Sequence, residues 1–103
     1  MDKREDIISI AKKYFELVKS SNFPMRIEKA YLFGSFAKGT ARKDSDIDIA
    51  FIVNNWEGGY EDTIVPIWNL CENVDLRIEP HFIVPEEDYA DFLPEIQKTG
   101  IEI

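Results

Sequence analysis

The spacing of hydrophobic residues changes several times along this chain, and each spacing predicts a different element. Near the N-terminus, hydrophobic residues recur at helical intervals, which is typical of an amphipathic helix over about residues 3–20. Dense apolar runs over 27–33 and 46–53 predict β-strands, and the second run is the clearest strand in the chain. A third run over 74–84 predicts another strand, in which Pro80 indicates a sheet edge or a bend.

The segments between these strands predict shorter helices. The stretch 34–42 predicts a turn that contains one or two helical turns, and 63–72 predicts a helix with Pro66 near its first turn. A last short helix is expected over 94–98, followed by a tail. This alternation of helices and strands favours the α/β class, with helices packed on a small mixed sheet, and we expect residues 1–103 to form a single domain.

Composition and charge narrow the classes of protein that fit. The 103 residues, 45% of them hydrophobic, are enough to build one core. No apolar run approaches the roughly 20 residues needed to span a membrane, and the charged N-terminus does not resemble a secretory signal. The single cysteine, Cys71, excludes an internal disulfide and suits the cytoplasm. The net charge of −8 argues against direct binding of nucleic acid.

Gly34 and Ser35 interrupt the first strand and begin a turn. Glycine lets a phosphate approach the backbone because it has no Cβ atom. Serine adds a hydroxyl at the start of a short helix, where backbone N–H groups favour anions. A plain strand-to-helix turn with a serine cap fits the same two residues, so this pair alone does not identify a phosphate site.

Asp46 and Asp48 begin the clearest strand. Side chains two positions apart on a strand point to the same face, so the two carboxylates project together. They repel each other unless a cation lies between them, and oxygen ligands of this kind suit Mg²⁺. A solvated polar face is the simpler alternative.

Asp75 offers a third carboxylate on the predicted third strand, where it shares a face with Arg77 and Glu79. If that strand lies beside the second, Asp75 can join Asp46 and Asp48. Three carboxylates can hold two metal ions about 3.5–4 Å apart, as in phosphoryl and nucleotidyl transfer. The carboxylate nearest the nucleophile can then accept its proton. A strand-start cap is the alternative role for Asp75.

In combination, these features resemble the polymerase-β-like nucleotidyltransferase superfamily, and within it the small MNT-type (minimal nucleotidyltransferase) branch. Gly-Ser, Asp-x-Asp after ten intervening residues and a later Asp on a strand form the shared pattern. The segments that carry the resemblance are 32–39, 45–49 and 74–76, and 96–101 looks like the closing segment of that branch. The resemblance therefore covers about residues 27–101.

The resemblance implies that Asp46 and Asp48 bind Mg²⁺ and that Asp75 completes a catalytic site for two ions. It also implies that AMP moves from ATP to a hydroxyl while pyrophosphate leaves.

For the nucleotide, the resemblance implies that Gly34 and Ser35 hold the triphosphate. Many members carry arginine in this turn, where the present chain has Phe36 and Lys38. Lys38 is therefore added to the candidate nucleotide-binding residues, with Arg42 as another source of positive charge. A surface role fits either side chain equally well.

In larger relatives, an added helical region supplies the acceptor-binding half of the site, and no segment of that size follows Asp75 in this sequence. The acceptor is therefore expected to come from another polypeptide, or the activity to be lost. By resemblance, MNT proteins are antitoxins that place AMP on a tyrosine of a helical HEPN-type ribonuclease, and this is the leading hypothesis. Two alternatives stay open. The chain could be a non-catalytic module that binds a nucleotide or partner, or it could transfer a nucleotide to a small molecule with a separate helical subunit.

Several other residues admit more than one role. Arg77 could contact a phosphate or pair with an acidic neighbour, and His81, the only histidine, is more typical of a surface or partly buried position than of a ligand. Trp56 could stack on a base or pack against its own domain. Trp68 and Cys71 are predicted to lie in the core.

Overall fold

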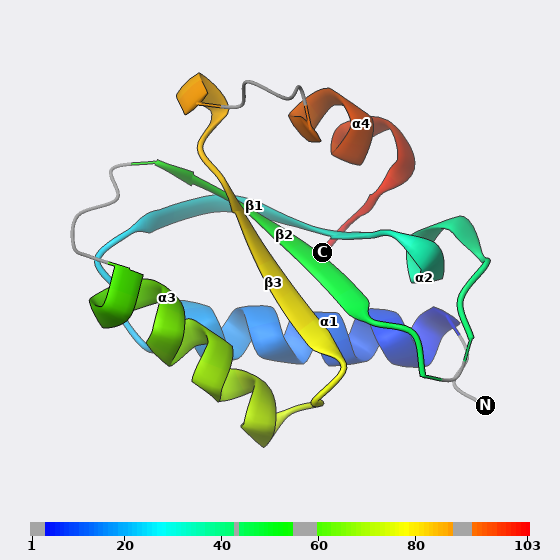
Figure 1. Ribbon diagram of the computed structural model, residues 1–103, viewed down its shortest axis with the longest axis horizontal. Coiled ribbons are helices and arrows are strands. Elements are labelled where there is room, and N and C mark those ends of the chain that lie inside the picture. Colours follow the sequence, from blue (N-terminus) through cyan, green and yellow to red (C-terminus); the bar gives the residue numbers. More distant parts are fainter. Residues whose placement is uncertain (1–3, 43, 55–59, 88–91) are drawn as a thin grey trace.

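A mixed β-sheet forms the centre of the structure, with the strand order β3-β2-β1-β4 (Figure 1). The computed structural model describes residues 4–42, 44–54, 60–87 and 92–103. The strands are β1 (Arg26–Phe33), β2 (Ile47–Asn54), β3 (Ile78–Ile83) and β4 (Ile101–Glu102). β1 runs antiparallel to both β2 and β4, whereas β3 runs parallel to β2. The predicted mixed sheet with helices packed on it is confirmed.

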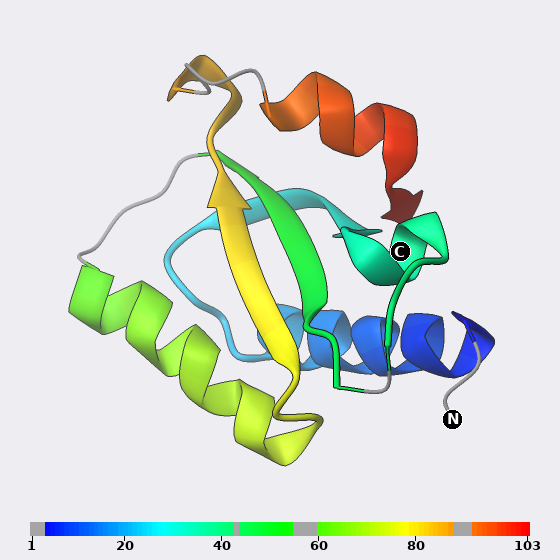
Figure 2. The ribbon, with the colours of Figure 1, turned by 45° about the vertical axis from the view of Figure 1, so that its right-hand side comes forward.

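The helices lie on both faces of this sheet and around its edge (Figure 2). They are α1 (Arg4–Ser20), α2 (Ser35–Lys38), α3 (Tyr60–Asn69) and α4 (Phe92–Thr99), with 3₁₀ turns at η1 (Leu70–Asn73) and η2 (Pro85–Glu87). Among the described residues, none of the helices is both long and apolar enough to cross a membrane.

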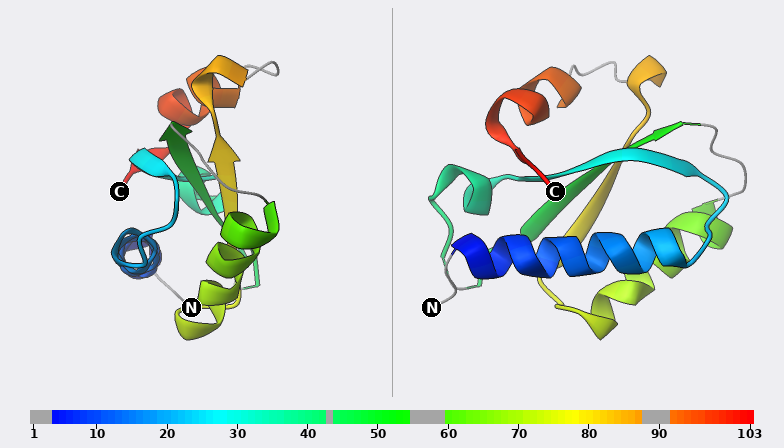
Figure 3. Two further views of the ribbon diagram at one scale, coloured as in Figure 1. Left: turned by 90° about the vertical axis from the view of Figure 1, so that its left-hand side faces the viewer. Right: turned by 180° about the vertical axis from the view of Figure 1, so that it is seen from behind.

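The main core lies between α1 and one face of the sheet, as the view from behind shows (Figure 3). The helical spacing of α1 predicted its buried side, and Ile7, Ala11 and Tyr14 are fully buried there. The Tyr14 hydroxyl donates a hydrogen bond of 2.6 Å to the backbone carbonyl of Ile67, which ties α1 to α3.

A second, smaller core lies on the opposite face of the sheet. There, α4 covers Tyr31, Ala50 and Ile52 with Ile96 and Leu93. Residues of β2 and β3 that lie earlier along these strands on the same face, among them Asp48, stay only half-buried. This partly covered face carries the polar residues described below.

The third strand starts later than predicted. The expected strand over 74–84 begins only at Ile78, because the chain first turns through η1. The backbone N–H groups of Val74 and Asp75 both donate to the carbonyl of Cys71. Asp75 therefore precedes β3 and does not lie on it, which corrects the predicted strand.

Two further expectations are changed by tertiary contacts. The predicted tail forms β4, whose residues pair with Tyr31 and Leu32 of β1. Trp68, predicted to be core, is 40% exposed, whereas Cys71 is buried as expected. Trp56 lies outside the described residues.

Candidate functional site

The parallel pairing of β2 and β3 places Glu79 directly beside Asp48. On the other side of β2, Phe33 of β1 is the antiparallel partner of Asp48. Residues paired across neighbouring strands present their side chains to the same face of the sheet. Asp48 therefore lies in the middle of a row, with an aromatic side chain on its β1 side and a carboxylate on its β3 side.

His81 completes a group with these two carboxylates. Its Nε2 atom lies 3.3 Å from Asp48 Oδ1 and 3.8 Å from Glu79 Oε1. Each of the three residues offers a ligand atom, and these atoms lie within 4.8 Å of one another. The His81 ring also packs on the Phe33 ring in a T-shaped arrangement, with the ring centroids 5.0 Å apart. We call Asp48, Glu79 and His81 the acidic cluster.

Asp46 adds a further carboxylate beside this cluster. Burial raises the pKa of the Glu79 carboxyl, and hydrogen bonding with Asp46 raises it further. The charge of His81 opposes this effect, while the charges of Asp46 and Asp48 add to it. Three carboxyl groups are thus crowded together without full compensation, so a divalent cation fits this site. Carboxylate oxygens are the ligands that Mg²⁺ prefers.

Asp75 is engaged elsewhere in the structure. The backbone N–H and Nε of Arg77 donate to Asp75 Oδ1 at 2.9 and 3.0 Å, and Nη2 donates to Oδ2 at 2.8 Å. This bidentate pairing lowers the pKa of the Asp75 carboxyl. The structure therefore brings Asp46 and Asp48 together with Glu79, and it holds Asp75 against Arg77 in the turn before β3.

The sequence carried a signal for Glu79, because its alternation with Asp75 and Arg77 placed all three residues on one predicted strand face. Deciding which of the two acids lies beside Asp48 required the register between β2 and β3, which sequence alone does not supply. His81 follows Glu79 by two positions and reaches the cluster for the same reason.

The Gly34–Ser35 turn lies against the acidic cluster. Gly34 has a φ of +77°, a conformation that favours glycine, and it directly follows the Phe33 partner of Asp48. A Cβ atom at this position would overlap the Asp48 carboxylate. The absence of a side chain at Gly34 thus lets the backbone of the turn approach a candidate metal ligand.

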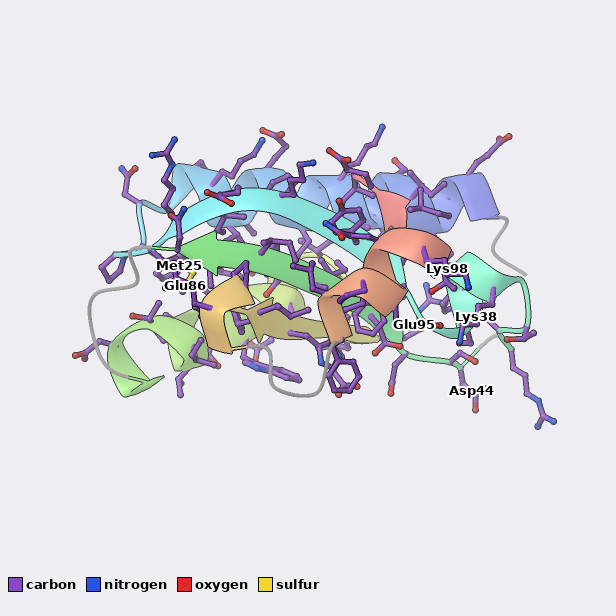
Figure 4. All side chains as sticks on the ribbon, turned by 90° about the horizontal axis from the view of Figure 1, so that it is seen from above. Met25, Lys38, Asp44, Glu86, Glu95 and Lys98 are labelled. Atoms are coloured by element: carbon purple, nitrogen blue, oxygen red, sulfur yellow. The ribbon has the colours of Figure 1, made fainter. Side chains whose placement is uncertain are left out.

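The other predicted nucleotide-binding residues lie around this turn. Ser35 begins α2, and its carbonyl accepts a hydrogen bond of 2.9 Å from the backbone N–H of Thr40. Lys38 is exposed at the end of α2 (Figure 4), and Arg42 is exposed in the loop that follows. Ser35 is thus part of the turn that contacts the cluster, whereas the two basic side chains extend from its periphery.

Residues 5–103 match the family model described as "Polymerase beta, Nucleotidyltransferase". No curated protein matches the chain.

Two solved structures resemble the fold. One is described as a candidate nucleotidyltransferase from Sulfolobus solfataricus, with 25% identity and a TM-score of 0.64 over 96% of this chain and 80% of that chain. The other is described as a toxin–antitoxin with AMP-PNP, with 20% identity and a TM-score of 0.65 over 88% of this chain and 70% of that chain. Both likenesses confirm the predicted fold class.

Proposed function

Because the chain belongs to the polymerase-β nucleotidyltransferase family, we propose that it transfers AMP from ATP, with Mg²⁺, to a hydroxyl group on a partner protein. The observation that carries this proposal is the contact between the Gly34 turn and Asp48, which itself lies beside Glu79. A turn suited to phosphate and a set of metal ligands thus meet at one point of the sheet. On this proposal, residues 1–103 act as one minimal nucleotidyltransferase domain in the cytoplasm.

Asp46, Asp48 and Glu79 would hold the metal, as one or two Mg²⁺ ions. Glu79 takes the place that the sequence pattern gave to Asp75, because Glu79 is the acid that pairs with Asp48 across the sheet. When bound, Mg²⁺ neutralises charge on the phosphate oxygens and polarises the phosphorus that is attacked. His81 contacts Asp48 Oδ1 and would orient that carboxylate.

Gly34 and Ser35 would bind the triphosphate through the backbone and hydroxyl groups of their turn. The missing Cβ of Gly34 lets this backbone lie directly against Asp48. Lys38 would supply positive charge from the end of α2 to the outer phosphates.

The reaction is an in-line displacement. The acceptor oxygen forms a bond to the α-phosphorus, and the bond from that phosphorus to the bridging oxygen of pyrophosphate breaks. The proton of the acceptor hydroxyl passes to the carboxylate of Glu79 and then to solvent. Since Gly34 and Glu79 lie on opposite sides of Asp48, pyrophosphate leaves on the β1 side and the acceptor enters from the β3 side.

We further propose that the acceptor is a tyrosine of a helical HEPN-type toxin and that the chain acts as its antitoxin. A structure of similar fold is described as a toxin–antitoxin with AMP-PNP, which supports both a nucleotide and a protein partner. The net charge of −8 complements a basic partner of the kind that cuts RNA.

The test is to incubate the protein with labelled ATP, Mg²⁺ and the product of the adjacent reading frame. We expect label on the partner, and we expect Asp46→Asn combined with Asp48→Asn to reduce the rate by at least about 100-fold. Asp44→Asn is the matched control, because Asp44 is an exposed acid in the loop that leads through Asp46 into β2 (Figure 4). Label transfer by the Asp46→Asn/Asp48→Asn variant at the wild-type rate would contradict the mechanism. Metal-dependent ATP binding without label transfer would indicate a non-catalytic binding module.

A further inference from the structure

A groove of about 510 Å³ follows the outer edge of β3 between α3 and α4. Its walls are Ile64 and Trp68 of α3 and Phe92 and Ile96 of α4, and residues 80–83 of β3 form its floor. β3 is an edge strand of the sheet, and no strand among the described residues pairs with its outer side. Pro80 fits such an edge because it has no N–H to donate to a further strand.

The groove opens onto the acidic cluster. His81 belongs to both, since it lines the groove and lies 3.3 Å from Asp48. Phe33, the β1 partner of Asp48, lines the groove as well. A molecule in the groove therefore lies beside the cluster from His81 of β3 to Phe33 of β1, whereas the Gly34 turn contacts Asp48 from the end of β1.

We propose that this groove binds an extended apolar segment of the acceptor protein and guides its hydroxyl to the acidic cluster. This inference rests on the proposed function, because an in-line displacement requires the nucleophile to enter opposite the leaving pyrophosphate. The groove reaches that entry side at His81. The groove therefore gives the acceptor protein an apolar binding surface next to the acidic cluster, which the cluster alone does not provide.

The lining favours a protein segment over the base of the nucleotide. Trp68 and Phe92 are 40% and 58% exposed, and Val65 on α3 is 40% exposed. Exposed aromatic residues beside a hollow are typical anchors of protein interfaces. Among the described residues that line the groove, His81 and Trp68 carry a polar side-chain atom, whereas recognition of a base relies on several placed polar groups.

The two-sided lining also suits an extended chain. Phe82 packs with the main core on one face of the sheet, and Ile83 packs with the second core on the other. Both line the groove, which therefore wraps around the edge of β3. A strand laid along this edge would direct alternate side chains to the two walls, as in the addition of a peptide strand to a sheet edge.

The test compares Trp68→Ala and Phe92→Ala with Leu76→Ala, a control residue that is 81% exposed and lies outside the groove. Calorimetry measures binding of the recombinant product of the adjacent reading frame and, separately, of ATP with Mg²⁺. For each groove variant we expect the Kd for the partner to rise at least about tenfold. The Kd for ATP should stay within about twofold, and the control should resemble the wild type in both. Both groove residues are well exposed, so the variants should fold, which melting temperatures would verify.

Each result has a distinct meaning. An unchanged partner Kd in both groove variants overturns the proposal, and a loss of ATP affinity instead would assign the groove to the nucleobase. Failure of the wild-type protein to bind the partner also overturns it, and the label-transfer assay then judges the proposed function by itself. If partner binding depends on Trp68 but no label is transferred, the role of the groove in partner binding is supported and the proposed function is contradicted.

Discussion

The backbone of Gly34 lies so close to the carboxylate of Asp48 that a Cβ atom at position 34 would overlap it. Gly34 also has a φ of +77°, so any other residue would be strained there. Two separate demands, one steric and one conformational, therefore require glycine at the point where the turn meets the acidic cluster.

Gly34→Ala should impair both folding and nucleotide binding. The backbone strain costs about 1–3 kcal/mol, since Gly34 has a ψ of −152° that other residues rarely combine with a positive φ. Displacement of Asp48 should weaken Mg²⁺-dependent ATP binding at least about tenfold. Gly39→Ala is a matched control, because Gly39 has the same φ of +77° but nothing within 4 Å of the added Cβ. Thermal unfolding and calorimetry with ATP and Mg²⁺ measure the two effects. Equal loss of ATP affinity in both variants would contradict the role given to the Gly34–Asp48 contact.

Glu79→Gln should mainly lower activity, whereas Asp75→Asn should mainly lower stability. Glu79 lies beside Asp48, so its change should lower the rate of AMP transfer by about 100-fold or more. Asp75 is held by Arg77, so its change should leave most of the activity while lowering the melting temperature. Label transfer and thermal unfolding of both variants check this expectation. If Asp75→Asn removed activity and Glu79→Gln did not, the metal site would have to include Asp75 as the sequence pattern implied.

The Asp75–Arg77 pairing should make the free energy of unfolding depend on pH. Arg77 lowers the pKa of Asp75 from its usual value of 3.8. The pairing therefore stabilises the folded protein above roughly pH 4, and the benefit is lost as the pH falls through the lowered pKa. Asp75→Asn should cost about 1–3 kcal/mol at neutral pH, and its difference from the wild type should shrink as the pH falls through the lowered pKa of Asp75. Urea unfolding at several pH values provides the measurement, and a difference independent of pH would rule out this ionic contribution.

Tyr14→Phe should destabilise the protein without affecting the site. The change removes the 2.6 Å hydrogen bond to the Ile67 carbonyl, which then stays buried without this donor. We expect a loss of about 1–3 kcal/mol, or a fall of roughly 4–8 °C in melting temperature for each kcal/mol. Affinity for ATP with Mg²⁺ at 25 °C should not change, and a lower affinity would show that α1 supports the site directly.

Local patterns predicted the elements and one half of the site. The periodic apolar residues of α1 and the alternation around Asp46 and Asp48 depend on near neighbours in the chain, and both were confirmed as a helix and the start of a strand. The Gly34 turn was also predicted, although its contact with Asp48 depends on the antiparallel register of β1 and β2.

What the sequence could not supply was the pairing between distant segments. The predicted third strand was four residues too long at its start, and only the parallel register of β2 and β3 shows that Glu79 is the neighbour of Asp48. Trp68 carries a residue type that is usually buried, yet α3 leaves it at the rim of the groove. Such placements depend on tertiary packing, which overrides local preference.

The short strand β4 has a mechanical consequence. Gly100 lies where a Cβ would strike the carbonyls of Ile96 and Leu32, so α4 is drawn tightly against β1. Beyond it, Ile101 pairs with Leu32, and the Ile103 N–H donates to the Ala30 carbonyl. β1 leads directly into Gly34, so this one strand carries both the α4 wall of the groove and the turn beside the acidic cluster. On the proposed function, β1 therefore fixes the spacing between the nucleotide-binding turn and the acceptor groove before either one is occupied.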